Sequence, residues 1–353
     1  MTPVAREARL RVVVANALAP QLCQRIGDVD PRVDVAVEHA LLAPMRFPGD
    51  HSGDPEFRRD DAQEARFTEL LESADVLYGI PDTSPARLAA VVRANPRLRW
   101  VHTMAAGGGS QVLAAGLTPD QLARVQFTTS AGVHGLPLAE WAIFGIFAGA
   151  KELPRLYAGQ LAHAWPERVV SRPVAGSTVL VLGLGGIGLQ VARLAGALGM
   201  RVLGVKRTPE AVEGVEVHPT SALADVIGEA DHVVVTLPGT RHTEGLLDAQ
   251  LLARAKRGVT VVNVGRGTVV DEPALVDALK TGQVGFAALD VFAVEPLPHD
   301  SPLWDLPNVL ISPHTAALDV REEERIAELF CQNLRAFLDG APMVNIVDAD
   351  QGY

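Results

Sequence analysis

Residues 178–207 constrain the fold of this chain more than any other part of the sequence. The run Val179–Leu182 is continuously apolar, which is typical of a strand buried on both faces of a parallel sheet. A helical Ala- and Leu-rich segment follows, from about Ile187 to Leu198, and Gly199 is well suited to end it. A second apolar run, Val202–Val205, comes next. This order predicts a strand, a helix and a second, parallel strand.

Three glycines join the first of these strands to the helix. Gly183, Gly185 and Gly188 have the spacing Gly-x-Gly-x-x-Gly. Gly183 permits a tight turn, Gly185 lets a pyrophosphate approach the backbone, and Gly188 lets the helix press on the sheet. The triplet alone is a weak signal, since chance turns also produce it. Between two convincing strands, it predicts a dinucleotide-binding site.

Length and charge limit the kinds of protein that fit the sequence. The chain has 353 residues, 48% of them hydrophobic, which suffices for two domains with separate cores. Its formal net charge is -11, and no basic run is longer than a pair. These features argue against binding to nucleic acids or to anionic membranes.

The two cysteines and the apolar runs bear on the compartment. Cys23 and Cys331 are far apart in the sequence and are expected to be buried thiols rather than a disulfide. The N-terminal residues lack the apolar core of a signal peptide. The longest apolar run, Trp141–Ala150, is shorter than the roughly 20 residues of a membrane helix. We therefore expect a cytoplasmic protein.

The first third of the chain predicts a small parallel sheet of its own, with helices on both faces. The expected strands are Leu10–Ala15, Val33–Val37, Ala74–Gly79 and Leu98–His102, and the expected helices are Pro20–Ile26, Asp60–Glu72 and Pro85–Ala94. The segment Met45–Arg59 interrupts this series with Pro, Gly, His and charged residues. It is predicted to be a surface loop, either a tolerated insertion or a lid or subunit contact.

The alternation of strands and helices continues along the rest of the chain. We expect strands at Phe127–Thr129, His232–Leu237, Val259–Val264, Gly285–Leu289 and Val309–Ser312, and helices at Leu136–Leu153, Asp248–Ala255, Glu272–Thr281 and Arg321–Leu338. The last helix is long enough to fold back onto the N-terminal third. The strands after the glycine unit end in loops rich in polar residues, Gly or Pro, and doubly wound sheets bind ligands at that edge.

Three ionisable residues follow such strands: Arg266, Glu295 and His314. The planar guanidinium of Arg266 can bind a carboxylate with two hydrogen bonds. His314 can exchange a proton near neutral pH, and Glu295 can fix its tautomer. Singly, each has a simpler explanation, as a surface ion pair, a solvated carboxylate or a capped turn residue. Together with a dinucleotide, they form a minimal set for hydride transfer to a 2-keto acid.

Other motifs are ambiguous or missing. Gly107, Gly108 and Gly109 follow a predicted strand, where their amides can bind an anion or simply form a flexible turn. The sequence has no Gly-x-Ser-x-Gly elbow and no His-Glu-x-x-His pair, so it supports neither a hydrolase nor a metal site.

The chain resembles the D-isomer-specific 2-hydroxyacid dehydrogenase family, which includes glyoxylate/hydroxypyruvate reductases. The resemblance spans nearly the full length and is carried by residues 181–188 (VLGLGGIG), 262–272 (VNVGRGTVVDE), 288–298 (ALDVFAVEPLP) and 303–316 (LWDLPNVLISPHTA). It implies that Arg266 binds the substrate, that His314 is the acid/base and that Glu295 supports it. It also implies that Ala106, Gly107 and Gly108 bind the substrate carboxylate.

The resemblance further implies an α/β fold with two doubly wound parallel-sheet domains. A Rossmann dinucleotide-binding domain, residues 133–318, is expected to be inserted into a discontinuous, flavodoxin-like substrate domain, residues 1–132 and 319–353. A homodimer is expected. Asp290 is expected near the nicotinamide carboxamide. The predicted cofactor-binding residues are Gly183, Gly185, Gly186, Ile187, Gly188, Lys206, Arg207, Thr208, Leu237, Pro238, Thr243, Val264, Asp290 and His314.

Two departures from the family pattern matter. NAD-preferring members carry an acidic residue at the end of the second strand, where this chain has Lys206, followed by Arg207 and Thr208. Basic side chains attract a 2′-phosphate, so we predict a preference for NADP(H); NAD is the alternative if these side chains only face solvent. The substrate loop continues as Gly108-Gly109-Ser110 instead of the usual Val or Ile plus Asp. The identity of the 2-keto acid therefore stays open.

The sequence as a whole predicts an enzyme that transfers hydride between NAD(P)H and a small or medium 2-keto acid, such as glyoxylate or hydroxypyruvate. The alternative from another class is a nucleotide-sensing module, because the same fold serves as an NADH-responsive corepressor. A third hypothesis is oxidation of formate or phosphite. The 3-phosphoglycerate dehydrogenase subgroup is not favoured, because little sequence follows Leu338 to form a regulatory domain.

Overall fold

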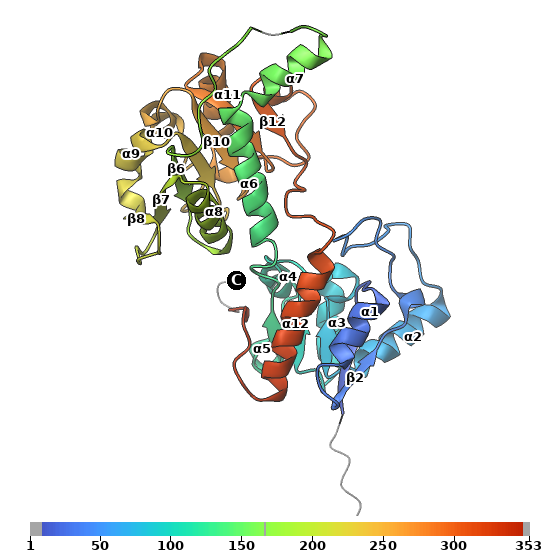
Figure 1. Cartoon of the computed structure of the whole chain (residues 1–353). Coiled ribbons are helices and arrows are strands. Elements are labelled where there is room, and N and C mark those ends of the chain that lie inside the picture. The colour runs from blue at the N-terminus through green and yellow to red at the C-terminus, as the bar shows by residue number, and fades with distance from the viewer. Residues whose placement is uncertain (1–8, 166, 349–353) are drawn as a thin grey trace, which may run out of the picture. The chain divides into compact units, whose positions relative to one another are not determined.

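The computed structural model describes residues 9–165 and 167–348 (Figure 1). The chain divides into two compact units. The split unit comprises residues 1–134 and 318–353, and the central unit comprises residues 135–317. Each unit contains one sheet. The predicted class, two parallel-sheet α/β domains, is confirmed.

The sheet of the split unit has the strand order β2-β1-β3-β4-β5, and every pairing is parallel. Its strands are β1 (Leu10–Val14), β2 (Val33–Ala36), β3 (Val76–Tyr78), β4 (Trp100–His102) and β5 (Gln126–Thr128). This is the flavodoxin-like order, which reverses direction between β1 and β3. A ligand-binding crevice is expected at the carboxyl ends of these two strands.

The helices of the split unit include one from the far end of the sequence. They are α1 (Pro20–Gly27), α2 (Asp61–Glu72), α3 (Pro85–Ala94), α4 (Gly109–Ala114), α5 (Pro119–Arg124) and α12 (Glu322–Leu338), with short 3-10 turns at His39–Leu41 and Pro81–Thr83. Phe330 of α12 stacks on Trp100 with ring centroids 4.7 Å apart, and meets Tyr78 edge-on at 5.0 Å. All three rings are buried, so aromatic packing fixes α12 to the N-terminal sheet.

The sheet of the central unit has the order β12-β11-β10-β9-β6-β7-β8 and is also parallel throughout. Its strands are β6 (Thr178–Leu182), β7 (Arg201–Lys206), β8 (Glu216–Pro219), β9 (His232–Val235), β10 (Val259–Asn263), β11 (Val284–Leu289) and β12 (Val309–Ile311). Numbered from β6, this is the Rossmann order 3-2-1-4-5-6 with one added strand. The order reverses between β6 and β9, so their carboxyl ends flank the expected cofactor crevice.

Helices cover both faces of the central sheet because successive strand side chains point to opposite faces. Alternate residues of β6 illustrate this, since Val179 and Val181 belong to one apolar core and Leu180 and Leu182 to the other. The helices are α6 (Gly135–Ala150) and α8 (Gly186–Ala197) on the first face, α9 (Leu223–Val226), α10 (Ala249–Arg254) and α11 (Glu272–Thr281) on the second, and α7 (Leu153–Leu161) after α6. Further 3-10 turns lie at Thr220–Ala222, Ile227–Glu229, Gly267–Val269 and Pro302–Asp305.

Some predicted elements need correction. The helix expected at Leu136–Leu153 is present as α6, but its predicted end is wrong, because α6 ends at Ala150 and α7 starts separately after Glu152, whose φ is 52°. Pro154 accounts for the break, since a proline inside a helix removes a hydrogen bond and clashes with the preceding turn. It is tolerated in the first turn of α7 instead. The elements α4, α5 and β8 were not predicted. None of the described helices is long and apolar enough to cross a membrane.

Candidate active site

The glycine turn lies at the carboxyl end of β6, beside the point where the strand order reverses. Gly183 has a φ of 98°, and a Cβ on Gly188 would lie only 1.9 Å from the carbonyl oxygen of Gly183. Side chains are therefore excluded at both positions. The Thr236 hydroxyl, just after β9, donates to the carbonyls of Leu182 and Gly183 at 3.0 and 2.8 Å. This pair of bonds fixes the turn to the neighbouring strand.

The start of α8 is open to a ligand. Gly185 is the N-cap residue, and no side chain among the described residues caps this helix. A Cβ added at Gly185 would have no neighbour within 4 Å, and both Gly185 and Gly186 are exposed. An uncapped helix N-terminus directs its amide N–H groups and positive dipole end at the space in front of it. The glycine turn therefore fits a pyrophosphate.

Arg266 follows β10 in a turn that is packed on both sides. A Cβ on Gly265 would lie 2.6 Å from the Leu237 carbonyl oxygen, and one on Gly267 would lie 1.9 Å from the Phe292 carbonyl carbon. The buried Asn263 side chain accepts from the Gly265 amide at 3.0 Å and donates to the Arg266 carbonyl at 3.1 Å. Packing and hydrogen bonds thus fix the Arg266 backbone, while its side chain is exposed.

His314 and Glu295 form a hydrogen-bonded pair. Nδ1 of His314 lies 2.7 Å from Oε2 of Glu295, and the Phe292 amide donates to Oε1 at 3.0 Å. Burial raises the pKa of the Glu295 carboxyl, but these hydrogen bonds and the charges of His314 and Arg266 outweigh burial and lower it. An ionised Glu295 accepts a hydrogen bond from the Nδ1–H group of His314, which leaves the other ring nitrogen free for proton exchange. The effect of both charges on Glu295 places Arg266 and His314 at the same end of the sheet.

Asp290 holds the loop that carries His314. Its Oδ1 accepts hydrogen bonds from the Ser312 hydroxyl at 2.6 Å and from the amides of Thr315 and Ala316 at 2.9 and 3.0 Å. Burial is the main effect on its carboxyl and raises the pKa. Oδ2 is buried and has no hydrogen-bond partner among the described residues. An unpaired buried oxygen is costly, so this atom fits a ligand N–H such as that of a carboxamide.

The basic residues predicted to select the cofactor lie at the end of β7. Lys206 is its last residue, and its ammonium group lies 2.9 Å from the Glu210 carboxylate. Arg207 and Thr208 follow and are exposed. Because the Glu210 side chain is 74% exposed, its ion pair with Lys206 is weak and can be exchanged for another anion.

The remaining predicted cofactor residues lie in the loops after β9 and β10. The Thr243 hydroxyl donates to the Pro238 carbonyl at 2.6 Å and closes the turn after Leu237. Val264 is buried, and its amide bonds to the Val235 carbonyl at 3.1 Å. The Thr243 hydroxyl and the Val264 side chain thus have structural contacts of their own. Within the described residues, no group of three or more His, Cys, Asp and Glu could hold a metal ion.

Comparisons with known proteins agree with this geometry. Residues 143–316 match the model of the D-isomer specific 2-hydroxyacid dehydrogenase, NAD binding domain. A glyoxylate reductase of Korarchaeum cryptofilum is 34% identical over 271 residues, which cover 74% of this chain and 80% of that protein. A D-isomer specific 2-hydroxyacid dehydrogenase of Xanthobacter autotrophicus Py2, solved in complex with NADPH and MES, matches with 31% identity and a TM-score of 0.73, over 98% of this chain and 100% of that one.

The chain belongs to the D-isomer specific 2-hydroxyacid dehydrogenase family. It is also 33% identical to a D-3-phosphoglycerate dehydrogenase of Mycobacterium leprae over 304 residues. The matched region covers 83% of this chain but only 56% of that protein. The chain thus spans less than three fifths of the length of that relative.

The predicted substrate loop of this family member lies in the split unit, at the carboxyl end of β4. Ala106 and Gly107 are exposed in the turn before α4. A Cβ on Gly108 would lie 1.8 Å from the Thr103 hydroxyl oxygen, so this position requires glycine. Gly107 has no such constraint, because a Cβ there would meet nothing within 4 Å. The turn presents backbone rather than side chains, as an anion site needs.

Three residues that hold the others in place were not predicted from the sequence: Thr236, Asn263 and Ser312. Each is a small polar residue at the carboxyl end of a strand. That position was the available signal, because such residues supply hydrogen bonds to the irregular backbone beyond a strand. Their partners are distant in sequence or in an adjacent loop, so the pattern alone does not reveal which bonds they make.

The lowered pKa of Glu295 predicts a pH effect on stability. Unfolded glutamates titrate near pH 4.3, so an ionised Glu295 stabilises the fold above about that pH, and this contribution is lost as the pH falls through the lower pKa of the folded state. Glu295→Gln should therefore reduce the free energy of unfolding at pH 7, and the difference from wild type should shrink on acidification below about pH 4.3. The side chain is 34% exposed, so we expect less than about 1 kcal/mol.

Urea unfolding between pH 3 and pH 7 measures this difference. The exposed Glu244 of the same unit provides the control, and Glu244→Gln should leave the pH profile unchanged. A deficit of Glu295→Gln that grows on acidification would contradict the assignment.

Proposed function

We propose that this chain reduces a small or medium 2-keto acid to the D-2-hydroxy acid with NAD(P)H, and catalyses the reverse oxidation. The observation that carries the proposal is the His314–Glu295 pair, at 2.7 Å, on the same sheet edge as Arg266 and the glycine turn. The glyoxylate reductase and the NADPH-bound dehydrogenase among the relatives support it.

In this mechanism Arg266 binds the substrate. Its guanidinium holds the carboxylate with two hydrogen bonds and polarises the keto oxygen. In the split unit, the exposed turn of Ala106 and Gly107 is proposed to bind a substrate carboxylate through its amides, and Gly108 permits this turn. Both contributions neutralise the anion and orient the carbonyl carbon.

His314 moves the proton. It donates to the keto oxygen as the alkoxide forms, and in the oxidation direction it takes the proton from the hydroxyl group. Glu295 keeps Nδ1 protonated, so the outward nitrogen is the one that acts, and it stabilises the imidazolium. The nicotinamide of the bound dinucleotide supplies or accepts the hydride. The glycine turn would hold its pyrophosphate, and Oδ2 of Asp290 its carboxamide.

His314→Asn tests the assignment. Asn tolerates the left-handed conformation of this residue, whose φ is 55°, but cannot exchange a proton at neutral pH. We expect kcat/KM for keto acids to fall about 10²- to 10⁴-fold, while NADPH binding, measured by fluorescence titration, stays within about threefold. The exposed His299 is the matched control, and His299→Asn should retain full activity.

The assay follows absorbance at 340 nm with glyoxylate, hydroxypyruvate and bulkier 2-keto acids. Full activity of His314→Asn would remove this residue from the mechanism. NADPH binding by the wild-type chain without turnover of any keto acid would favour the nucleotide sensor, and turnover of formate or phosphite instead would favour the third hypothesis.

We infer that the chain prefers NADP(H) over NAD(H). Lys206 ends β7 at the position of the ribose-binding residue, and the exposed Arg207 follows it. The Lys206→Ala/Arg207→Ala double variant should lower kcat/KM for NADPH about tenfold or more, since each charge-assisted hydrogen bond is worth about 1.5–3 kcal/mol. The value for NADH should change little. An equal loss with both cofactors, or a wild-type preference for NADH, would contradict the inference.

We also propose a homodimer that uses α7 and the adjoining chain. Large apolar side chains are exposed there: Leu153, Leu156, Tyr157, Leu161, Trp165, Val169 and Val170. Extended exposed apolar surface marks protein interfaces. Light scattering should give twice the mass of one chain, and Leu156→Asp/Leu161→Asp should give a monomer. The control Val344→Asp, at an exposed apolar residue of the split unit, should stay dimeric. A monomeric wild-type chain would overturn this proposal.

The cytoplasmic location stays a prediction. It is supported by Cys23 and Cys331, which are free, buried thiols, as is usual in a reducing compartment.

A further inference from the structure

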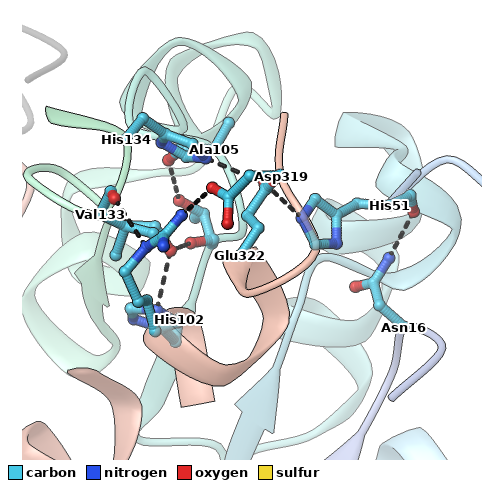
Figure 2. Close-up of polar contacts among 11 residues, drawn as sticks. Asn16, His51, His102, Ala105, Val133, His134, Asp319 and Glu322 are labelled. Atoms are coloured by element: carbon cyan, nitrogen blue, oxygen red, sulfur yellow. Dashed lines mark hydrogen bonds and ion pairs between the residues drawn. The ribbon is translucent and has the colours of Figure 1, made fainter. Parts of the chain in front are cut away.

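A buried carboxylate in the split unit joins two histidines. Glu322 is the first residue of α12 and is 2% exposed. Its Oε1 lies 3.1 Å from Nε2 of His51 and 2.9 Å from Nε2 of His134, and Figure 2 shows Glu322 between the two rings. Burial raises the pKa of the Glu322 carboxyl, but the hydrogen bonds from His134 and His51 outweigh it and lower the pKa to about 2. An ionised carboxylate only accepts, so both Nε2 atoms donate.

This carboxylate connects three segments that are far apart in sequence. His51 belongs to the 45–59 loop, and His134 is the last residue before the chain enters the central unit. Glu322 lies just after Leu318, where the chain returns from that unit. Arg325, one turn along α12, adds an ion pair to Asp319 and a hydrogen bond to the Val133 carbonyl at 3.1 Å. Both connecting segments are therefore anchored at the start of α12.

The loop that His51 belongs to lies at the carboxyl edge of the split-unit sheet. The Asn16 side chain, just after β1, donates to the His51 carbonyl at 3.0 Å. A Cβ on Gly79, just after β3, would lie 1.7 Å from Oδ1 of Asn16. The loop thus covers the point where the strand order reverses between β1 and β3. Doubly wound sheets bind ligands at this point.

The loop lines a pocket together with the residues that directly precede the predicted substrate turn. Gly49 and His51 contribute from the loop, Met104 and Ala105 from the chain after β4, and Gln111 from α4. Ala105 directly precedes Ala106 and Gly107, which are proposed to bind the substrate carboxylate. The position of the 45–59 loop therefore shapes the space next to that turn.

We propose that Glu322 is a positioning residue that holds the 45–59 loop through His51, and the 130–134 segment through His134, in the arrangement that the keto acid requires. The effect on keto acid binding rests on the proposed function, whereas the anchoring of the two segments does not.

The site is specific for a carboxylate. One oxygen accepts from two donors, which a charged acceptor does more strongly than a neutral amide. The second oxygen, Oε2, is buried without a hydrogen-bond partner among the described residues. It lies against Gly49, where a Cβ would approach it to 2.3 Å. A glutamine would place an N–H group or an oxygen in this apolar contact and would hold the two histidines less firmly.

Hydrogen exchange of the full-length chain without ligand tests the anchoring. Glu322→Gln should speed amide exchange in both segments, 45–53 and 130–134, and leave the central unit unchanged. His51→Ala should affect only the loop, and His134→Ala only the second segment. His51→Gln retains an N–H donor and should restore much of the loop's protection. Glu328→Gln is the control, because Glu328 lies on the same helix in an ion pair with Arg25 and is 66% exposed.

Kinetics test the consequence for the substrate. Glu322→Gln should raise KM for the keto acid by about tenfold, in keeping with the cost of misplacing a binding group, while kcat and KM for NADPH change less than about threefold. Unchanged exchange in both segments would overturn the proposal. Faster exchange throughout the split unit, with equal losses in every kinetic parameter, would also overturn it, because Glu322 would then act only on stability. The exchange result holds whichever substrate the chain uses.

Discussion

The position of His314, which follows β12, depends on a buried carboxylate that follows the preceding strand. Asp290 follows β11, and its Oδ1 accepts bonds from Ser312, before His314, and from Thr315 and Ala316, after it. These bonds hold the loop on both sides of a residue whose own backbone has a φ of 55°. Such a conformation is costly for most residues and persists only when its surroundings enforce it. The imidazole therefore points where Asp290 and Glu295 direct it.

The two carboxyls of this site have opposite pKa shifts for a physical reason. Burial is the first effect on both. For Asp290 it prevails, although three hydrogen bonds oppose it, and the pKa is raised. Glu295 is more exposed, so burial weighs less, and the hydrogen bonds from His314 and Phe292 together with the charges of His314 and Arg266 lower its pKa. Environments that shift two carboxyls apart are typical of active sites. Glu295 is thus suited to stabilise an imidazolium, and Asp290 to accept hydrogen bonds from the backbone amides of the His314 loop.

Much of this arrangement could be predicted from the sequence because it depends on local pattern. Continuous apolar runs identified β6 and β10, and the glycine spacing identified the turn before α8. Arg266 and His314 were found because polar residues directly after buried strands gather at one edge of a parallel sheet. The separate helix α7 was not predicted, because the expected helix ran on to Leu153, just before Pro154, whereas α6 ends at Ala150.

The network around Glu322 could not be predicted in the same way. His51 and Glu322 are 271 residues apart, and neither lies in a recognisable motif. The 45–59 segment shows only the composition of a loop, and Glu322 is the first of three consecutive glutamates at the start of an amphipathic helix. Sequence gives no reason to bury that one rather than Glu323 or Glu324. Only the return of α12 to the N-terminal sheet, through Phe330 and Trp100, decides it.

Each unit thus contains a hydrogen-bonded histidine and glutamate at its sheet edge, and exposure separates their roles. The side chains of His314 and Glu295 are 48% and 34% exposed, as the proton exchange proposed for His314 requires. Those of His51 and Glu322 are 15% and 2% exposed, and Glu322 is shared with a second histidine. An enclosed carboxylate such as Glu322 is suited to accept hydrogen bonds from His51 and His134 but not to exchange a proton. A change in its charge would leave a buried hydrogen-bond partner unpaired. The same pair of residue types is therefore proposed to support proton exchange in the central unit and loop position in the split unit.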